Sequence, residues 1–186
     1  MGRYSEVFYI YPDPFDDGTG SKKVALRICL FREVKNADHL LAELRSGKIT
    51  GSLIKAELVH STFQLLAAAN RALHASKHEK MITKNVHTEL IYSLSPTTSI
   101  SDSLLTFGIS ENTTDILAAL VGDSSGDCLT KLLKVIKGKS VPLKELKNVT
   151  NVSKIKEVYH LKEPELNFSS IDDSIVSRMI AKDYGA

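Results

Sequence analysis

The hydrophobic residues near the start of the chain follow the patterns of β-strands. Residues 7–11 combine aromatic and β-branched side chains, and residues 24–31 form a second apolar run with partial alternation. The segment between them concentrates Pro, Asp and Gly, which favour turns. We therefore predict an antiparallel hairpin whose tip, residues 12–22, is a flexible, solvated loop.

Several later segments have the spacing of amphipathic helices. Residues 38–45 place their leucines on one helical face, and Gly47 is positioned to end that helix. A longer helix is predicted from Ser61 to about Ser76, because Ser61 and Gln64 form a capping box before an apolar stripe. Further helices are predicted over residues 99–107 and 129–137, after Asn151, and from Ser169 or Ser170 onwards.

Two further segments are predicted to be strands. In residues 86–94 the apolar side chains alternate with polar ones, so that one face can be buried while the other faces solvent. Residues 116–121 are continuously apolar, which is typical of a strand buried on both faces. The order of elements favours an α+β fold with a largely antiparallel sheet of four to five strands packed with helices. Residues 1–186 are predicted to form a single domain, since this length provides one substantial core.

Composition and charge narrow the functional classes. The 24 Lys and Arg residues nearly balance the 22 Asp and Glu residues, so any affinity for nucleic acid must come from a local cluster. No apolar run approaches the roughly 20 residues that span a bilayer, which excludes a membrane span. Glu6 lies where a signal peptide would be apolar, and Cys29 and Cys128 are the only cysteines, so we expect an intracellular protein with free thiols.

The sequence lacks the local motifs that announce catalysis. It has no Gly-x-Ser-x-Gly elbow, no phosphate-binding Gly-Lys-Ser/Thr loop and no Cys-x-x-Cys pair. His74 and His78 lie four residues apart on a predicted helix and could face a metal ion, but no third ligand is evident, and a solvated helix face explains them better. We therefore predict no catalytic residue, no cofactor and no metal site.

Basic residues gather where the long predicted helix ends. Arg71, Lys77, Lys80 and Lys84 could neutralise the phosphates of a nucleic acid. The alternative is that they are ordinary surface residues, since cations are favoured at and after a helix C-terminus. The residues alone leave both interpretations open.

The predicted C-terminal helix is amphipathic, with acidic residues early and basic residues late. Its apolar stripe either closes the core of its own domain or lies in a groove of a partner protein. The stripe consists of Ile171, Ile175, Val176, Met179 and Ile180.

Several segments, taken in their order and spacing, resemble the TPRKB family, the kinase-binding subunits of the KEOPS (EKC) complex. No single motif is diagnostic, and the resemblance extends from about Val24 to the end of the chain. The matching segments are FREVKNA (31–37), GKITGSLI (47–54), FQLLAAANRALH (63–74), TELIYSLSP (88–96), FGIS (107–110) and SRMIAKD (177–183).

This resemblance implies a non-catalytic subunit of the assembly that makes N6-threonylcarbamoyladenosine in tRNA. In the family, the subunit binds the atypical kinase/ATPase PRPK, which in turn contacts the catalytic transferase subunit. Archaeal relatives help to hold the 3′ CCA end of the tRNA. The resemblance further implies a small mixed α/β domain that acts in the cytoplasm and nucleus, without a membrane.

The tRNA-binding residues are assigned partly from the resemblance and partly from charge. Lys80, Lys84 and Asn85 lie where archaeal relatives have a polar, basic segment, so the resemblance implies that the tRNA end lies near them. Arg71 and Lys77 are added from charge clustering alone.

We assign the kinase interface to the apolar stripe of the C-terminal helix. On this hypothesis, Ile175→Glu leaves the fold intact and abolishes kinase binding, because a charge in an interface is desolvated without a partner. The alternative function is an autonomous RNA-binding module with no obligate kinase partner. An independent enzyme with dispersed catalytic residues is a third hypothesis.

Overall fold

The centre of the structure is a sheet whose two middle strands are almost entirely apolar. The computed structural model describes residues 4–12 and 23–184. Within these residues, a five-stranded antiparallel sheet has the order β1-β2-β4-β3, and β5 pairs with β2 beyond the end of β1. The strands are β1 (Glu6–Ile10), β2 (Val24–Arg32), β3 (Ser52–Lys55), β4 (Ile116–Val121) and β5 (Lys139–Val141).

Both faces of the sheet are buried, which explains the continuous apolar runs. On β2, Ile28 and Leu30 belong to one hydrophobic core, whereas Cys29 and Phe31 belong to the other. The prediction that residues 116–121 form a strand buried on both faces is confirmed, because five successive residues of β4 are buried.

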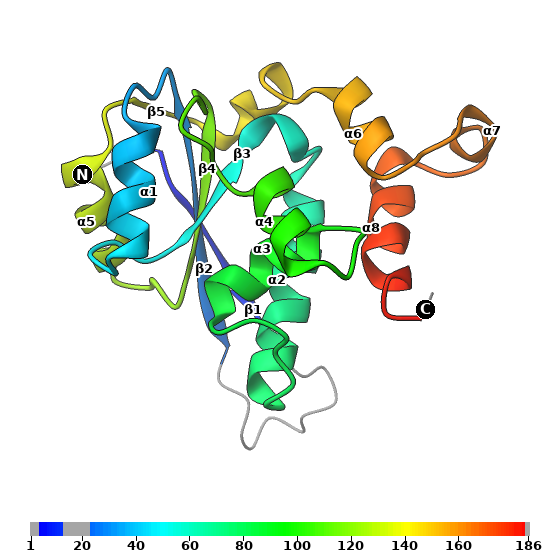
Figure 1. Cartoon of the computed structure of the whole chain (residues 1–186), viewed down its shortest axis with the longest axis horizontal. Helices are drawn as coiled ribbons and strands as arrows, with labels where there is room; N and C mark the ends of the chain where they lie inside the picture. Colours follow the sequence, from blue (N-terminus) through cyan, green and yellow to red (C-terminus); the bar gives the residue numbers. More distant parts are fainter. Residues whose placement is uncertain (1–3, 13–22, 185–186) are drawn as a thin grey trace.

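Helices cover the sheet on both sides (Figure 1). The face of Cys29 and Phe31 packs against α1 (Ala37–Arg45) and α5 (Asp127–Val135). The opposite face is covered by α2 (Thr62–Lys77), α3 (Val86–Leu94) and α4 (Ile100–Phe107). Beyond that layer lie α6 (Val152–Val158), α7 (Glu163–Leu166) and α8 (Ile171–Ala181), and α8 packs on α2. Two short 3-10 helices, η1 (Ala56–Leu58) and η2 (Leu143–Asn148), follow β3 and β5.

Residues 86–94 form the helix α3, so the strand predicted at this position is wrong. Asn85 begins the helix, since its side-chain oxygen accepts hydrogen bonds from the backbone N–H groups of His87 (3.1 Å) and Thr88 (3.0 Å). Every residue from Glu89 to Leu94 is buried, because α3 lies between α2 and the sheet. The polar residues Glu89 and Ser93 are buried in α3, so the alternation of polar and apolar residues does not mark an exposed face and imitates the period of a strand.

The other predicted elements agree with the structure to within a few residues. The hairpin of β1 and β2 is present, while residues 13–22 of its predicted tip lie outside the residues that the structure describes. Sequence analysis does not identify β3 and β5, which are four and three residues long. The α+β fold with a largely antiparallel sheet and a C-terminal helix is confirmed.

We expect Asn85→Ala to lower the free energy of unfolding by about 1 kcal/mol, the usual cost of losing a helix N-cap. Asn85→Asp keeps an oxygen acceptor at this position and should recover most of the loss. Urea-induced unfolding followed by circular dichroism measures both variants. Equal stability of the wild type and the alanine variant would show that this cap contributes nothing to α3.

Candidate interaction surfaces of the C-terminal helix and the α2–α3 connection

The C-terminal helix α8 runs parallel to α2, because polar contacts join the two helices near both ends. Near their N-terminal ends, the Asp172 carboxylate accepts a hydrogen bond from the Ser61 hydroxyl (2.6 Å). Further along α2, the Arg71 guanidinium donates to the Met179 carbonyl and the Asp183 carboxylate at the other end of α8. The helix is therefore held to α2 near both of its ends.

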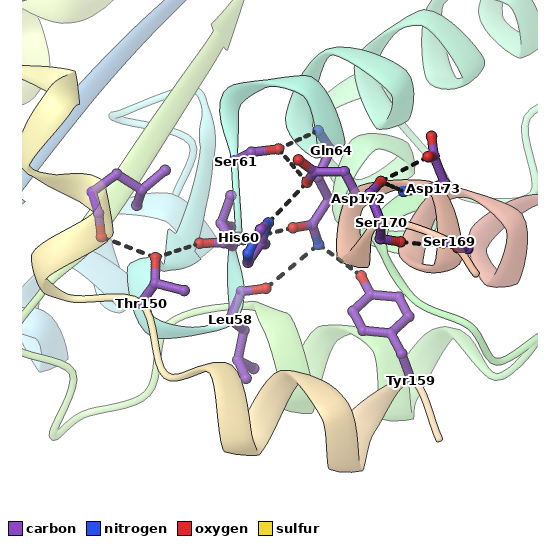
Figure 2. A network of polar contacts seen from close by, with 12 residues as sticks. Leu58, His60, Ser61, Gln64, Thr150, Tyr159, Ser169, Ser170, Asp172 and Asp173 are labelled. Carbon is purple, nitrogen blue, oxygen red and sulfur yellow. Dashed lines mark hydrogen bonds and ion pairs between the residues drawn. The ribbon is translucent and has the colours of Figure 1, made fainter. Parts of the chain in front are cut away.

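Figure 2 shows how buried polar side chains extend this contact into the molecule. The Asp172 carboxylate lies 2.9 Å from Nδ1 of His60, and the His60 backbone N–H donates to the Gln64 side chain (2.7 Å). Gln64, which is fully buried, donates to the Tyr159 hydroxyl (2.8 Å), and that hydroxyl donates to the Leu94 carbonyl (2.5 Å). Burial raises the pKa of Tyr159, so the phenol keeps the proton that it donates. The series of bonds joins α2, the end of α3 and the end of α6.

The five residues of the predicted kinase interface divide between core and surface. Ile175 and Met179 are 0% and 1% exposed and belong to the core beneath α8. Ile180 is 50% exposed, whereas Ile171 and Val176 are half-buried. Ile175→Glu is therefore expected to unfold the chain, contrary to the expectation from sequence, because its carboxylate would be buried without a partner. Within the stripe, Ile180 is the residue most accessible to a partner.

The predicted tRNA-binding residues also separate. Arg71 is turned toward α8, where it forms its ion pair, and its side chain is 23% exposed. Lys77 is exposed in the last turn of α2, and Lys80 and Lys84 are exposed in the connection between α2 and α3. Asn85 is exposed, and its side-chain oxygen is engaged as the N-cap of α3. The structure thus places four of the five residues at one end of the α2–α3 pair.

Glu89 holds the α2–α3 connection, a role that sequence analysis missed. The residue is 3% exposed, and its carboxylate accepts hydrogen bonds from the backbone N–H and the hydroxyl of Thr83, each at 2.7 Å. Thr83 directly precedes Lys84, so these bonds fix the backbone that carries the lysine. Recognising residues 86–94 as a helix would have drawn attention to Glu89, because a carboxylate in the first turn attracts nearby N–H groups.

Lys182 attaches the end of α8 to α3. Its Nζ donates a hydrogen bond to the Tyr92 carbonyl and lies 3.6 Å from the centroid of the Tyr92 ring, and the residue is only 7% exposed. Burial, and then the neighbouring Arg71 cation, lower the pKa of Lys182 to about 8, although the carboxylates of Asp183 and Glu89 oppose this. The buried amine therefore loses its proton in a mildly alkaline range.

Lys182 should make stability depend on pH. Its pKa is about 8 in the folded chain and 10.5 ordinarily, so between these values the unfolded state binds more protons and stability rises with pH. Relative to Lys182→Met, the wild type should gain roughly 1 to 2 kcal/mol in free energy of unfolding from pH 7 to pH 9.5. Urea unfolding of both proteins at several pH values measures this difference. A constant difference would contradict the lowered pKa.

Two kinds of site were not found among residues 4–12 and 23–184. In this part of the chain, no group of three or more His, Cys, Asp or Glu side chains is placed to hold a metal ion. No helix among the same residues is long and apolar enough to cross a bilayer.

Comparison with known proteins identifies the family. The family model described as "Kinase binding protein CGI-121" matches residues 31–183. The EKC/KEOPS complex subunit TPRKB of Danio rerio is 34% identical over 155 residues, which are 83% of this chain and 89% of the relative. The EKC/KEOPS complex subunit cgi121 of Aspergillus fumigatus is 34% identical over 144 residues, 73% of this chain and 76% of the relative. The corresponding subunit of Yarrowia lipolytica is 34% identical over 140 residues, with 73% and 79% covered. The chain therefore belongs to the CGI-121 family of kinase binding proteins, as the resemblance to TPRKB predicted.

Proposed function

We propose that this chain is a non-catalytic subunit of an EKC/KEOPS complex that binds the atypical kinase/ATPase PRPK and supports N6-threonylcarbamoyladenosine modification of tRNA. The observation that carries the proposal is the family match over residues 31–183, which includes every helix from α1 to α8. Similar proteins named as EKC/KEOPS complex subunits support it. Through the kinase, the chain would act indirectly on the transferase subunit.

The outward side of α8 is the proposed kinase surface. Ile180, in the last turn of α8, and Tyr184, three residues after the helix ends, are 50% and 85% exposed. Because Arg71 and Ser61 hold α8 near both ends, these side chains are presented from a fixed backbone, which lowers the entropic cost of binding. Exposed apolar side chains on an ordered helix suit a groove in a partner.

We expect Ile180→Glu to weaken kinase binding at least tenfold, because its carboxylate would be desolvated in the interface without a partner. Leu105→Glu is the matched control, since Leu105 is 76% exposed on α4, and it should bind the kinase as the wild type does. Titration calorimetry with the purified kinase measures both affinities, and circular dichroism checks the folds. Unchanged affinity for Ile180→Glu would move the kinase surface away from this end of α8.

We further propose that the α2–α3 connection helps to hold the 3′ CCA end of tRNA. Lys80 and Lys84 are exposed there, and the bonds between Glu89 and Thr83 order the backbone between the two lysines. An ordered loop that presents cations can contact the phosphates of a single strand.

The double variant Lys80→Gln, Lys84→Gln should weaken tRNA binding by the assembled complex and flatten the dependence of log affinity on log salt by about 1.4, or 0.7 per lost contact. With tRNA that lacks the CCA end, the variant and the wild type should bind equally. Fluorescence anisotropy over a salt series measures both quantities. An equal loss with intact and trimmed tRNA would place the contact elsewhere on the tRNA.

The alternative, an autonomous RNA-binding module, makes a different prediction in the same assay. The isolated chain would then bind tRNA as tightly as the assembled complex does, and Ile180→Glu would leave tRNA binding unchanged in both. Binding that requires the assembled complex would exclude this alternative.

A further inference from the structure

Positive charge is concentrated in one part of the chain. Residues 128–156 contain eight lysines and a single acidic residue, Glu145, which gives this segment a charge of +7. The whole chain carries only +2, so the remaining residues together carry −5. A near-neutral molecule therefore has one strongly cationic segment.

This segment begins far from α8 and ends near it. In Figure 1 it passes from α5 and β5, on the left, across the top to α6, which lies above α8 on the right. Three of its lysines pair with carboxylates: Lys139 with Glu33, Lys154 with Glu57 and Lys156 with Glu163. The other five are exposed and form no ion pair with any residue that the structure describes; we call them the lysine track. The track consists of Lys131, Lys134, Lys137, Lys144 and Lys147.

The backbone of the track at the end of α5 is fixed by Asn36, which is 7% exposed. Its side chain donates to the Val135 carbonyl (2.9 Å) and accepts from the Lys137 backbone N–H (2.8 Å). The Lys35 backbone N–H donates to the Lys137 carbonyl (3.0 Å), which places a further exposed lysine beside the track. The end of α5 is thereby tied to the start of α1, and the cations are spaced by an ordered scaffold.

The chemistry of this surface fits phosphates. Lysine is a compact cation that binds phosphate oxygens, and several spaced lysines match a chain of phosphates. A membrane-binding surface also needs apolar side chains to insert, yet no large hydrophobic side chain is exposed between Leu105 and Val152, all of which the structure describes. Attraction to the α5 dipole accounts for Lys134 but not for Lys144 and Lys147, which lie on η2.

We propose that the lysine track binds the phosphate backbone of an RNA, at a surface separate from both α8 and the α2–α3 connection. The sheet separates the lysines of α5 from α2 and α3, whereas η2 packs on the same core as α2 and α3. One RNA would therefore contact α5 and the α2–α3 connection at different points along its length. The inference rests on the proposed function in taking that RNA to be tRNA.

The test compares two variants with the same change in charge. The first replaces Lys131, Lys134 and Lys137 by Gln, and the control replaces three paired lysines, Lys48, Lys154 and Lys156, by Gln. Binding of tRNA is measured from 50 to 200 mM salt with the full-length chain in the assembled complex, using intact tRNA and tRNA without its CCA end. Thermal unfolding checks that both variants are folded.

The track variant should bind both tRNAs more weakly, and the slope of log affinity against log salt should become shallower by about 2 to 3, or 0.9 per lost duplex contact. The control should keep the wild-type slope. The track variant should therefore lose affinity even for tRNA without its CCA end. The Lys80→Gln, Lys84→Gln variant should lose affinity only for intact tRNA.

Three outcomes would overturn the inference. If the track variant binds like the wild type while the Lys80→Gln, Lys84→Gln variant is weakened, the track does not contact RNA and the proposed function stands. If neither variant changes binding, the proposed tRNA contact fails as well. If the wild type binds vesicles of 70% phosphatidylcholine and 30% phosphatidylserine as tightly as tRNA, and the track variant loses vesicle binding alone, the track is a membrane contact.

Discussion

The packing of α2, α3, α6 and α8 on one another depends on buried polar side chains that find their partners inside the chain. A buried donor or acceptor that loses its partner costs about 1–3 kcal/mol, so an alternative position of α8 must replace each bond that it breaks. Gln64, Tyr159 and Lys182 each bridge two elements in this way. Directional bonds of this kind select one position of the helix, whereas apolar contacts alone would tolerate sliding.

The helix α3 connects the two surfaces to which the proposed function assigns binding. Its first turn carries Glu89, which holds Thr83 in the basic connection, and one turn later the Tyr92 carbonyl receives Lys182 from α8. Because α3 is buried between α2 and the sheet, it has little room to move independently. A partner bound to α8 and a ligand bound at the connection would therefore act on the same rigid element.

Capping residues and hydrophobic spacing predicted most of the helices and strands. The predictions that failed concern features that depend on long-range packing. Ser61, Ser99 and Ser170 cap the helices that the sequence pattern placed after them, since a capping bond spans only three residues. Residues 86–94 were mistaken for a strand because the polar residues Glu89 and Ser93 are buried in the helix, so the alternation of polar and apolar residues does not mark its exposed side. The burial of Ile175 and the pairing of Arg71 with Asp183 depend on tertiary packing, which spacing along the chain does not encode. The resemblance indicated the family, while the structure determined which side chains are accessible.

The contacts that Lys182 and Asp183 make just after α8 limit how far the chain can be shortened. Lys182 and Asp183 come after the last helical residue, Ala181, yet they supply the bonds to Tyr92 and Arg71. A fragment that stopped at the helix boundary would keep the apolar stripe but leave the Arg71 cation without its counter-ion. Domain boundaries for expression or crystallisation should therefore be drawn beyond residue 183 rather than at the end of regular secondary structure.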